Sequence, residues 1–219
     1  MLDNILDKRD IDPDKLQLVG VTSLWIASKV EEYYPAELPK LIHLTEDSYK
    51  PSHVIQMEKI ILRILHFNVY FPEPMVFLLR FARAALRPDD SVFISTCQYL
   101  IDSFIIHAEF SSTRPSLLAA GAVLASLHLF SAAEDASTPP SCWTPTLVHY
   151  SGYAEGEVVP VARAMLREVF TAATEDDYKY KGAHTKYKSQ SQHKRLVLQT
   201  HLAPQVIQKA ALKLGDSIF

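Results

Sequence analysis

The sequence contains few cysteines and few glycines, the residues on which disulfide-stabilised proteins and phosphate-binding loops depend. Its 219 residues include two cysteines and six glycines. Two isolated cysteines, Cys97 and Cys142, do not make a disulfide framework, so we expect a chain that folds in a reducing compartment. The glycines are scattered, and none belongs to a glycine-rich phosphate-binding loop. The length allows one large or two small domains, each with its own packed core.

Long apolar runs are also missing. There is no run of about 18 uncharged apolar residues, so the sequence predicts no membrane span and no membrane partner. The first turns carry acids, whereas a secretory signal needs a basic start and an apolar middle, so we expect no signal peptide. The net charge of −3 argues against binding to nucleic acid or acidic membranes over the whole surface.

Acidic residues are missing from one long segment, Tyr178–Gly215. The same segment carries eight basic residues: Lys179, Lys181, Lys186, Lys188, Lys194, Arg195, Lys209 and Lys213. Such a run usually faces water, and we expect a solvated tail with a terminal helix. The alternative is an electrostatic contact with an acidic partner or with nucleic acid.

Catalytic and metal-binding motifs are scarce, and the sequence predicts no enzyme, no cofactor and no metal. His107-x-Glu109 matches the start of a zinc deaminase signature, but the required P-C-x-x-C is missing. We expect His184, His193 and His201 to be exposed polar residues. Cys97 lies on an apolar helix face, where it is expected to act as a small buried hydrophobe.

Strand signals are rare, and prolines mark the starts of helices instead. No Asn-Gly or Asp-Gly turn occurs. Proline suits the first turn of a helix, because its missing N–H has no partner there. The pattern predicts an all-α protein with a short helix after Thr144 and longer helices over about 13–34, 51–66, 74–86, 90–110, 115–130, 155–173 and 204–214. Pro160 predicts a kink or a shortened start in the helix that contains it.

Two helical segments, Leu16–Ala27 and Leu117–Leu129, are nearly apolar on all sides. A helix of this kind is surrounded by other helices, so each predicts the centre of its own bundle. Ile26-Ala-Ser matches Leu124-Ala-Ser at an offset of 98 positions, a weak repeat that favours two related domains in tandem. The link between them is predicted over Asn68–Pro74, which contains two prolines.

One stretch is specific enough to indicate a family. Residues 15–35, Lys-Leu-Gln-Leu-Val-Gly-Val-Thr-Ser-Leu-Trp-Ile-Ala-Ser-Lys-Val-Glu-Glu-Tyr-Tyr-Pro, closely resemble the central helix of the cyclin box in mitotic B-type and A-type cyclins. Three further segments keep the order and spacing of that box: Leu44–Tyr49, Met57–Leu62 and Leu65–Asn68. Segments that resemble the C-terminal box and the last region of the family are Phe71–Leu78, Arg114–Ala120 and Lys186–Ser189.

The resemblance implies tandem cyclin-fold helical bundles, the first of them incomplete. A cyclin box has five helices, and this chain begins inside what resembles the second, at Asn4–Lys8. The expected parts are an N-terminal box over 1–70 that lacks its first helix, a C-terminal box over 71–175, and a basic segment with a terminal helix over 176–219. The missing helix carries the family's Met-Arg-Ala-Ile-Leu substrate-docking motif. We therefore expect no functional docking patch, although Gln17 resembles one of its peripheral residues.

The function that the resemblance implies is that of a regulatory subunit. Such a subunit binds and activates a cyclin-dependent serine/threonine kinase in cell-cycle control, here at the G2/M transition. An active protein kinase pairs its β3 lysine with a glutamate on its C-helix. A cyclin holds this helix inward, and its binding shifts the kinase population toward the active state. The expected locations are nucleus and cytoplasm.

The resemblance also assigns a kinase-binding surface. Lys29 and Glu58 would be the polar pair that hydrogen-bonds the kinase segment leading into its C-helix. An apolar floor around the pair would comprise Ile26, Val30, Leu62, Phe67 and Val69. Residues four apart share a helix face, which places Ile26 near Val30 and Glu58 near Leu62. The alternative is that the apolar residues belong to the core and that the charged pair is a solvated ion pair worth under about 1 kcal/mol.

Two other interpretations stay open from the sequence. One is a cyclin-fold transcription or nucleic-acid-binding module, which the basic segment favours. The other is an incomplete cyclin that does not activate a kinase. In that case the missing helix should leave apolar faces exposed near Leu18 and Leu24.

Overall fold

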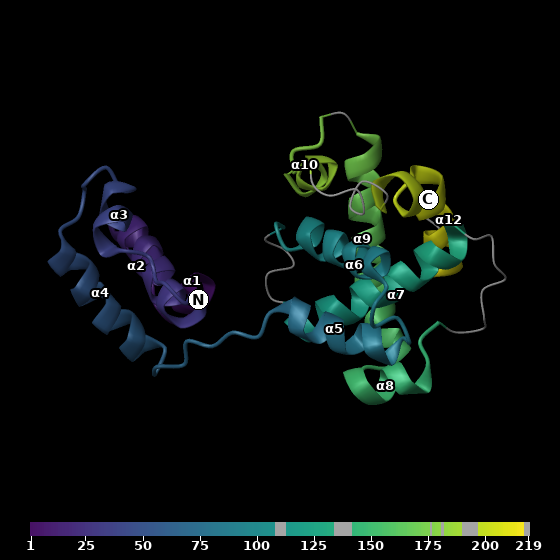
Figure 1. Ribbon diagram of the computed structural model, residues 1–219, viewed down its shortest axis with the longest axis horizontal. Coiled ribbons are helices and arrows are strands. Elements are labelled where there is room, and N and C mark those ends of the chain that lie inside the picture. Colours follow the sequence, from purple (N-terminus) through teal and green to yellow (C-terminus); the bar gives the residue numbers. More distant parts are fainter. Residues whose placement is uncertain (108–112, 134–141, 176, 181, 190–196, 217–219) are drawn as a thin grey trace. The chain divides into compact units, whose positions relative to one another are not determined.

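The chain forms two compact helical units, Met1–Phe71 and Pro72–Phe219. The computed structural model describes residues 1–107, 113–133, 142–175, 177–180, 182–189 and 197–216. Figure 1 shows helices in both units, and the described residues include no strand, so the predicted all-α class is confirmed. The predicted link, Asn68–Pro74, spans the boundary between the two units.

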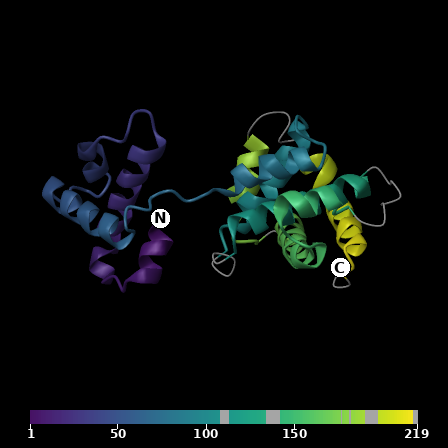
Figure 2. The same cartoon turned by 90° about the horizontal axis from the view of Figure 1, so that it is seen from below.

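The first unit has a small core between few helices. These are α1 (Leu2–Lys8), α2 (Pro13–Glu31), α3 (Leu38–His43) and α4 (Pro51–Ile64). Figure 2 shows them in purple to blue. The longest pair, α2 and α4, packs side by side, and α1 and α3 each contact both. The fully buried apolar residues of this core are Ile5, Val19, Ile26, Ile61 and Leu65.

Local sequence signals set the ends of these helices. Pro13 begins α2, and the Asp12 carboxylate caps it by accepting a bond from the backbone N–H of Asp14 at 3.3 Å. The helix ends at Glu31, three residues before the predicted end. The Ser28 hydroxyl accepts from the backbone N–H of Ala36 at 3.2 Å, which ties the following loop back onto the helix. The second unit uses the same capping device at Asp90 and Thr144.

The prediction that α2 is buried on all sides is wrong. Its buried residues are Val19, Thr22, Ser23 and Ile26, whereas Leu16 and Leu24 are 44% and 55% exposed. The three other helices of the unit cover only part of its circumference. The exposure expected near Leu18 and Leu24 is found at Leu24, while Leu18 is half-buried.

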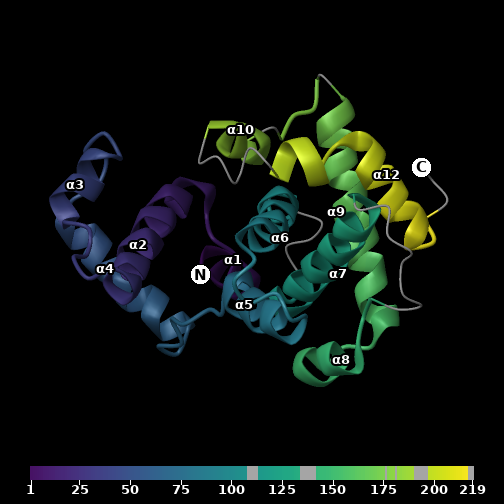
Figure 3. The ribbon, with the colours of Figure 1, turned by 45° about the vertical axis from the view of Figure 1, so that its right-hand side comes forward.

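The second unit is built around one central helix. Its elements are α5 (Pro74–Ala84), α6 (Ser91–Phe104), α7 (Pro115–Ala133), α8 (Pro145–Ser151), α9 (Glu155–Thr174), α10 (Gly182–Ser189), a π-helical turn (Val197–His201) and α12 (Pro204–Lys213). Figure 3 shows α7 among α5, α6, α9 and α12, all of which contact it. Every residue from Leu118 to Ser126 is buried, which confirms the predicted central helix. Gly121 lets α9 approach closely, because a Cβ atom there would lie 2.7 Å from Val161.

The sequence predicts no membrane span, but the central helix has the length and composition of one. Within the unit, however, 72% of its apolar window is buried. A helix at the centre of a globular bundle needs the same composition, so the match is weak evidence for a membrane-spanning role.

The basic C-terminal segment is part of the second unit rather than a separate tail. Here α10 packs on α6, and α12 packs on α7 and α9. The segment buries Tyr187, Val197, Leu202, Ile207 and Ala210. The three-part division expected from the sequence therefore differs from the two observed units. The sequence-based expectation rested on the basic residues and did not consider the apolar residues that recur at helical spacing in the same segment.

A shortened start of α9 is likewise not observed. The helix begins at Glu155, ahead of Pro160, and continues to Thr174. The Glu157 carboxylate accepts a bond from the backbone N–H of Ala154 at 2.8 Å and caps the first turn.

Candidate functional site

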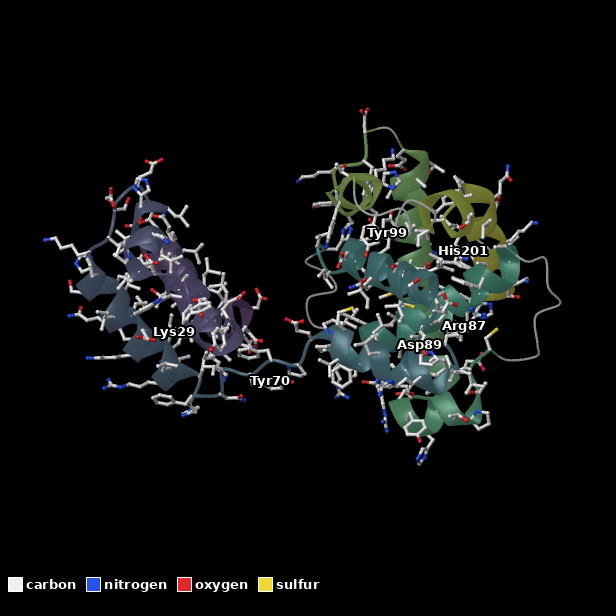
Figure 4. The ribbon with its side chains drawn as sticks, viewed as in Figure 1. Lys29, Tyr70, Arg87, Asp89, Tyr99 and His201 are labelled. Carbon is white, nitrogen blue, oxygen red and sulfur yellow. The ribbon has the colours of Figure 1, made fainter. Side chains whose placement is uncertain are left out.

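An ion pair joins the two longest helices of the first unit on their outer side. The Lys29 ammonium in the last turn of α2 donates to the Glu58 carboxylate in the middle of α4. Figure 4 shows Lys29 between these helices. The side chains are 35% and 17% exposed, so the pair reaches the surface but is partly desolvated. The sequence placed these two residues together, and the structure brings them into contact.

Trp25 is a further member of this site that the sequence analysis missed. The Lys29 ammonium lies 3.7 Å from the centroid of the Trp25 ring, within the range of a cation–π contact. The signal was available, since a lysine four residues after a tryptophan on one helix face can reach its ring. With Trp25 below it and Glu58 beside it, the ammonium is held in place before any partner arrives.

Four of the apolar residues assigned to the floor keep some surface accessible to solvent. Val30 and Phe67 are 45% and 70% exposed. Leu62 and Val69 are half-buried and pack against the small core. They come from the end of α2, the end of α4 and the segment after α4.

Ile26 differs from the other members of the predicted set. It is 3% exposed and belongs to the core between α2 and α4. One side of α2 must face α4 for the unit to fold, and Ile26 lies on that side. Its side chain therefore supports the surface from below and has little area left for a partner.

Phe67 has an unusual backbone conformation. It and His66 both lie in the left-handed region, with φ of 58° and 50°. The backbone N–H of Phe67 donates to the carbonyl of Leu62 at 2.8 Å, and that of His66 donates to Arg63 at 3.1 Å, which closes the C-terminus of α4. Glycine usually occupies such positions, because a Cβ atom is strained there. The closure directs a large aromatic side chain into solvent.

The histidines on which metal or catalytic chemistry could depend have structural contacts instead. Nε2 of His107 lies 2.8 Å from the Glu168 carboxylate and 3.1 Å from the Tyr178 hydroxyl. The prediction that His184 and His201 are exposed is wrong, because both are half-buried and packed against aromatic rings. His193 lies outside the described residues. Among the residues that the structure describes, no three His, Cys, Asp or Glu side chains are arranged to hold a metal.

The basic segment offers less free charge than its sequence indicates. The Lys186 ammonium is 2.9 Å from the Asp102 carboxylate on α6. Lys213 donates to the backbone and hydroxyl oxygens of Ser131 on α7. Lys181, Lys194 and Arg195 lie outside the described residues. In the described part of this segment, Lys186 and Lys213 therefore serve contacts within the second unit.

Both units match models of one family. Residues 1–70 match the cyclin N-terminal domain, and residues 72–200 match the cyclin C-terminal domain. The two matches meet at the boundary between the observed units. The chain therefore belongs to the cyclin family, whose members are regulatory subunits rather than enzymes.

The similar curated proteins are mitotic cyclins. The chain is 33% identical over 196 residues to a G2/mitotic-specific cyclin-B of Drosophila melanogaster, which covers 89% of this chain and 36% of that protein. It is 31% identical over 218 residues to a G2/mitotic-specific cyclin-B2 of Rana japonica, covering 100% of this chain and 52% of that protein. The chain thus spans about half or less of the length of these relatives.

A solved structure supports the fold independently. A viral cyclin from herpesvirus saimiri superposes with a TM-score of 0.59 at 23% identity, over 76% of this chain and 71% of that chain. The tandem cyclin fold expected from the sequence is confirmed.

Proposed function

We propose that this chain binds a cyclin-dependent serine/threonine kinase and activates it in cell-cycle control, at the G2/M transition. The observation that carries the proposal is the Lys29–Glu58 pair, held at the surface of the first unit beside accessible apolar side chains. The G2/mitotic-specific cyclins to which the chain is similar support the assignment to this stage.

The polar pair can position a partner segment. An ammonium group has three donors, and one of them is used by Glu58 in the free protein. The remaining donors suit backbone carbonyls at the end of a partner helix, while Glu58 can accept from backbone N–H groups. Because both side chains are already partly desolvated, little further loss of hydration is needed when a partner covers them.

The apolar residues would supply most of the affinity. A helix of the kinase that covers Val30, Leu62 and Phe67 removes their exposed surface from water, which favours the bound state. If those contacts form only when the kinase C-helix lies inward, binding shifts the kinase toward its active state. Truncating a central anchor in such an interface commonly costs about 2 kcal/mol or more.

The decisive experiment removes the pair and leaves the fold intact. The double variant Lys29→Ala, Glu58→Ala should lose capture of a cyclin-dependent kinase and stimulation of histone phosphorylation by about tenfold or more. The matched control is Lys40→Ala, Glu37→Ala, which removes an exposed pair at 3.1 Å in the same unit. Circular dichroism should show unchanged helix content in both. Full activation by the first variant, or equal loss in the control, would refute the proposed site.

The proposal includes a location in nucleus and cytoplasm. Imaging of a fluorescently tagged chain in synchronised cells tests both the location and the stage. A signal confined to one compartment, or kinase stimulation that peaks outside G2/M, would contradict these parts of the proposal.

A further inference from the structure

A hollow in the first unit is lined by residues other than those of the proposed kinase-binding surface. It is formed by the end of α1, the segment that leads to α2, and one flank of α4. Two adjoining depressions of about 610 and 410 Å³ share Asp10, Ile11, Ile60 and Ile64, so they form one continuous groove. These volumes are typical of sites that accept a few side chains of a ligand.

The floor of this groove is apolar and reaches the core of the unit. Ile5, Val19 and Ile61 line it, although each is nearly fully buried. Ile60, which is 47% exposed, extends the apolar surface toward solvent. A groove that opens onto core residues gives an inserted apolar side chain contacts on several sides.

The rim of the groove is predominantly positive. Four permanent cations line it: Lys8, Arg9, Lys15 and Arg63. None of them forms an ion pair with another described residue. Two carboxylates also line the groove, and one of them, Asp12, is used to cap α2. The unpaired cations favour a ligand that carries negative charge around an apolar centre.

The groove and the proposed kinase-binding surface use different flanks of α4. An α-helix turns by roughly 100° per residue, so Ile60 and Glu58 are about 200° apart around its axis. Ile64 shares the flank of Ile60, and Leu62 shares that of Glu58. One ligand in the groove and another partner over the Lys29–Glu58 pair would therefore not compete for the same side chains.

We propose that this groove docks a short amphipathic segment of a partner protein, with apolar side chains against Ile60 and Ile64 and carboxylates toward Lys8, Arg9 and Arg63. The groove then recruits an acidic peptide while the other flank of α4 stays free. The assignment stands on the geometry of the first unit and does not depend on kinase activation.

The test uses the full chain and a displayed library of helical peptides. Leucine or phenylalanine occupies one face of each peptide, and glutamate or aspartate occupies the other. A matched library carries lysine and arginine in place of the acids. We expect saturable binders from the acidic library alone, with affinity that falls as salt is raised. No binder from the acidic library, equal recovery from both libraries, or binding of phosphatidylserine vesicles in place of peptides overturns the proposal.

Variants on α4 provide the specificity control. Ile60→Glu and Arg63→Glu should each weaken the selected peptide by about tenfold or more. Ile55→Glu and Lys59→Glu change an exposed isoleucine and lysine that do not line the groove, and they should leave the affinity unchanged. Equal weakening by the two control variants overturns the proposed location. Because all four positions are exposed, circular dichroism should confirm that the variants fold.

Discussion

Phe67, like Leu86, combines a left-handed backbone with a large exposed side chain. It is 70% exposed, and its φ is 58°. A left-handed conformation costs a residue with a Cβ atom roughly 1 kcal/mol, and the exposed ring gains little from burial in return. The backbone conformation closes the C-terminus of α4, and we expect the exposed aromatic side chain to serve binding. His66 is equally strained but carries no large apolar side chain.

Substitution by glycine separates these two roles. Phe67→Gly should leave stability unchanged or raised by up to about 1 kcal/mol, because the backbone strain is relieved, yet it should weaken kinase capture by about tenfold. His66→Gly relieves the same kind of strain and should leave capture unchanged. Urea unfolding and a kinase pull-down measure the two effects. Unaltered capture by Phe67→Gly would remove this residue from the proposed surface.

The two cysteines should differ strongly in reactivity. Cys97 is fully buried, donates to the Ser126 hydroxyl at 3.1 Å, and has its pKa raised by burial to about 12. Cys142 is half-buried, and burial followed by the charge of Glu155 raises the pKa of its thiol. Since the thiolate is the reactive form, a thiol reagent at pH 8 should modify Cys142 slowly and Cys97 only on unfolding. Equal modification rates of the two thiols in the native protein would contradict the burial of Cys97.

Among the helices, α12 depends on two arginines of α9. Arg163 and Arg167 are four residues apart and share one face. Arg167 forms a bidentate pair with Asp216, with N–O distances of 2.7 and 2.6 Å, and the Asp216 side chain is only 2% exposed. Nε of Arg163 donates to the carbonyl of Leu214 at 2.9 Å, where a cation also complements the negative end of α12. This contact makes the last helix part of the core.

Loss of this contact should destabilise the second unit. We expect Asp216→Ala to lower the free energy of unfolding by about 1–3 kcal/mol, because two charge-assisted hydrogen bonds to a buried carboxylate are lost. The exposed Lys40–Glu37 pair is the comparison, and Lys40→Ala should cost less than about 1 kcal/mol. Urea denaturation measures the free energy of unfolding of both variants. Equal losses would show that the contact of Asp216 with Arg167 stabilises the protein no more than an exposed ion pair does.

At the scale of the whole molecule, the two units have separate cores of very different size. The larger core contains His128, which is 6% exposed on α7. No described residue hydrogen-bonds its Nδ1. Burial, with a further contribution from Lys213, lowers the pKa of His128 from 6.5 to about 4. Between pH 6.5 and about 4, His128 is therefore neutral in the folded second unit and protonated in the unfolded chain.

Mild acid should therefore destabilise the second unit. Between pH 6.5 and about 4 the unfolded state binds a proton at His128 that the folded state does not, so the free energy of unfolding falls as pH is lowered. The expected slope is at most about 1.4 kcal/mol per pH unit. His128→Gln should flatten the slope, whereas His149→Gln, at an exposed position, should not. Denaturant titrations from pH 7 to 4 measure both, and an unchanged slope in His128→Gln would refute this origin.

The fold class and family followed from local patterns. Proline and aspartate predict helix starts because their effect on the first turn depends only on neighbouring residues in the chain. The family is recognised because the cyclin-box residues keep a fixed order. The burial of α7 was predicted because its apolar residues cover every side. The pairing of Lys29 with Glu58 was also anticipated, but only through the family resemblance.

Tertiary structure alone decided which apolar residues are covered. The sequences of α2 and α7 look alike, yet α7 is surrounded by helices while α2 leaves Leu16 and Leu24 exposed. Burial depends on how many neighbours are packed around a helix, and no local pattern encodes that number. The basic segment is a second example. Its charges are evident in the sequence, but only the contacts of α12 with α7 and α9 show that its apolar residues are part of the core.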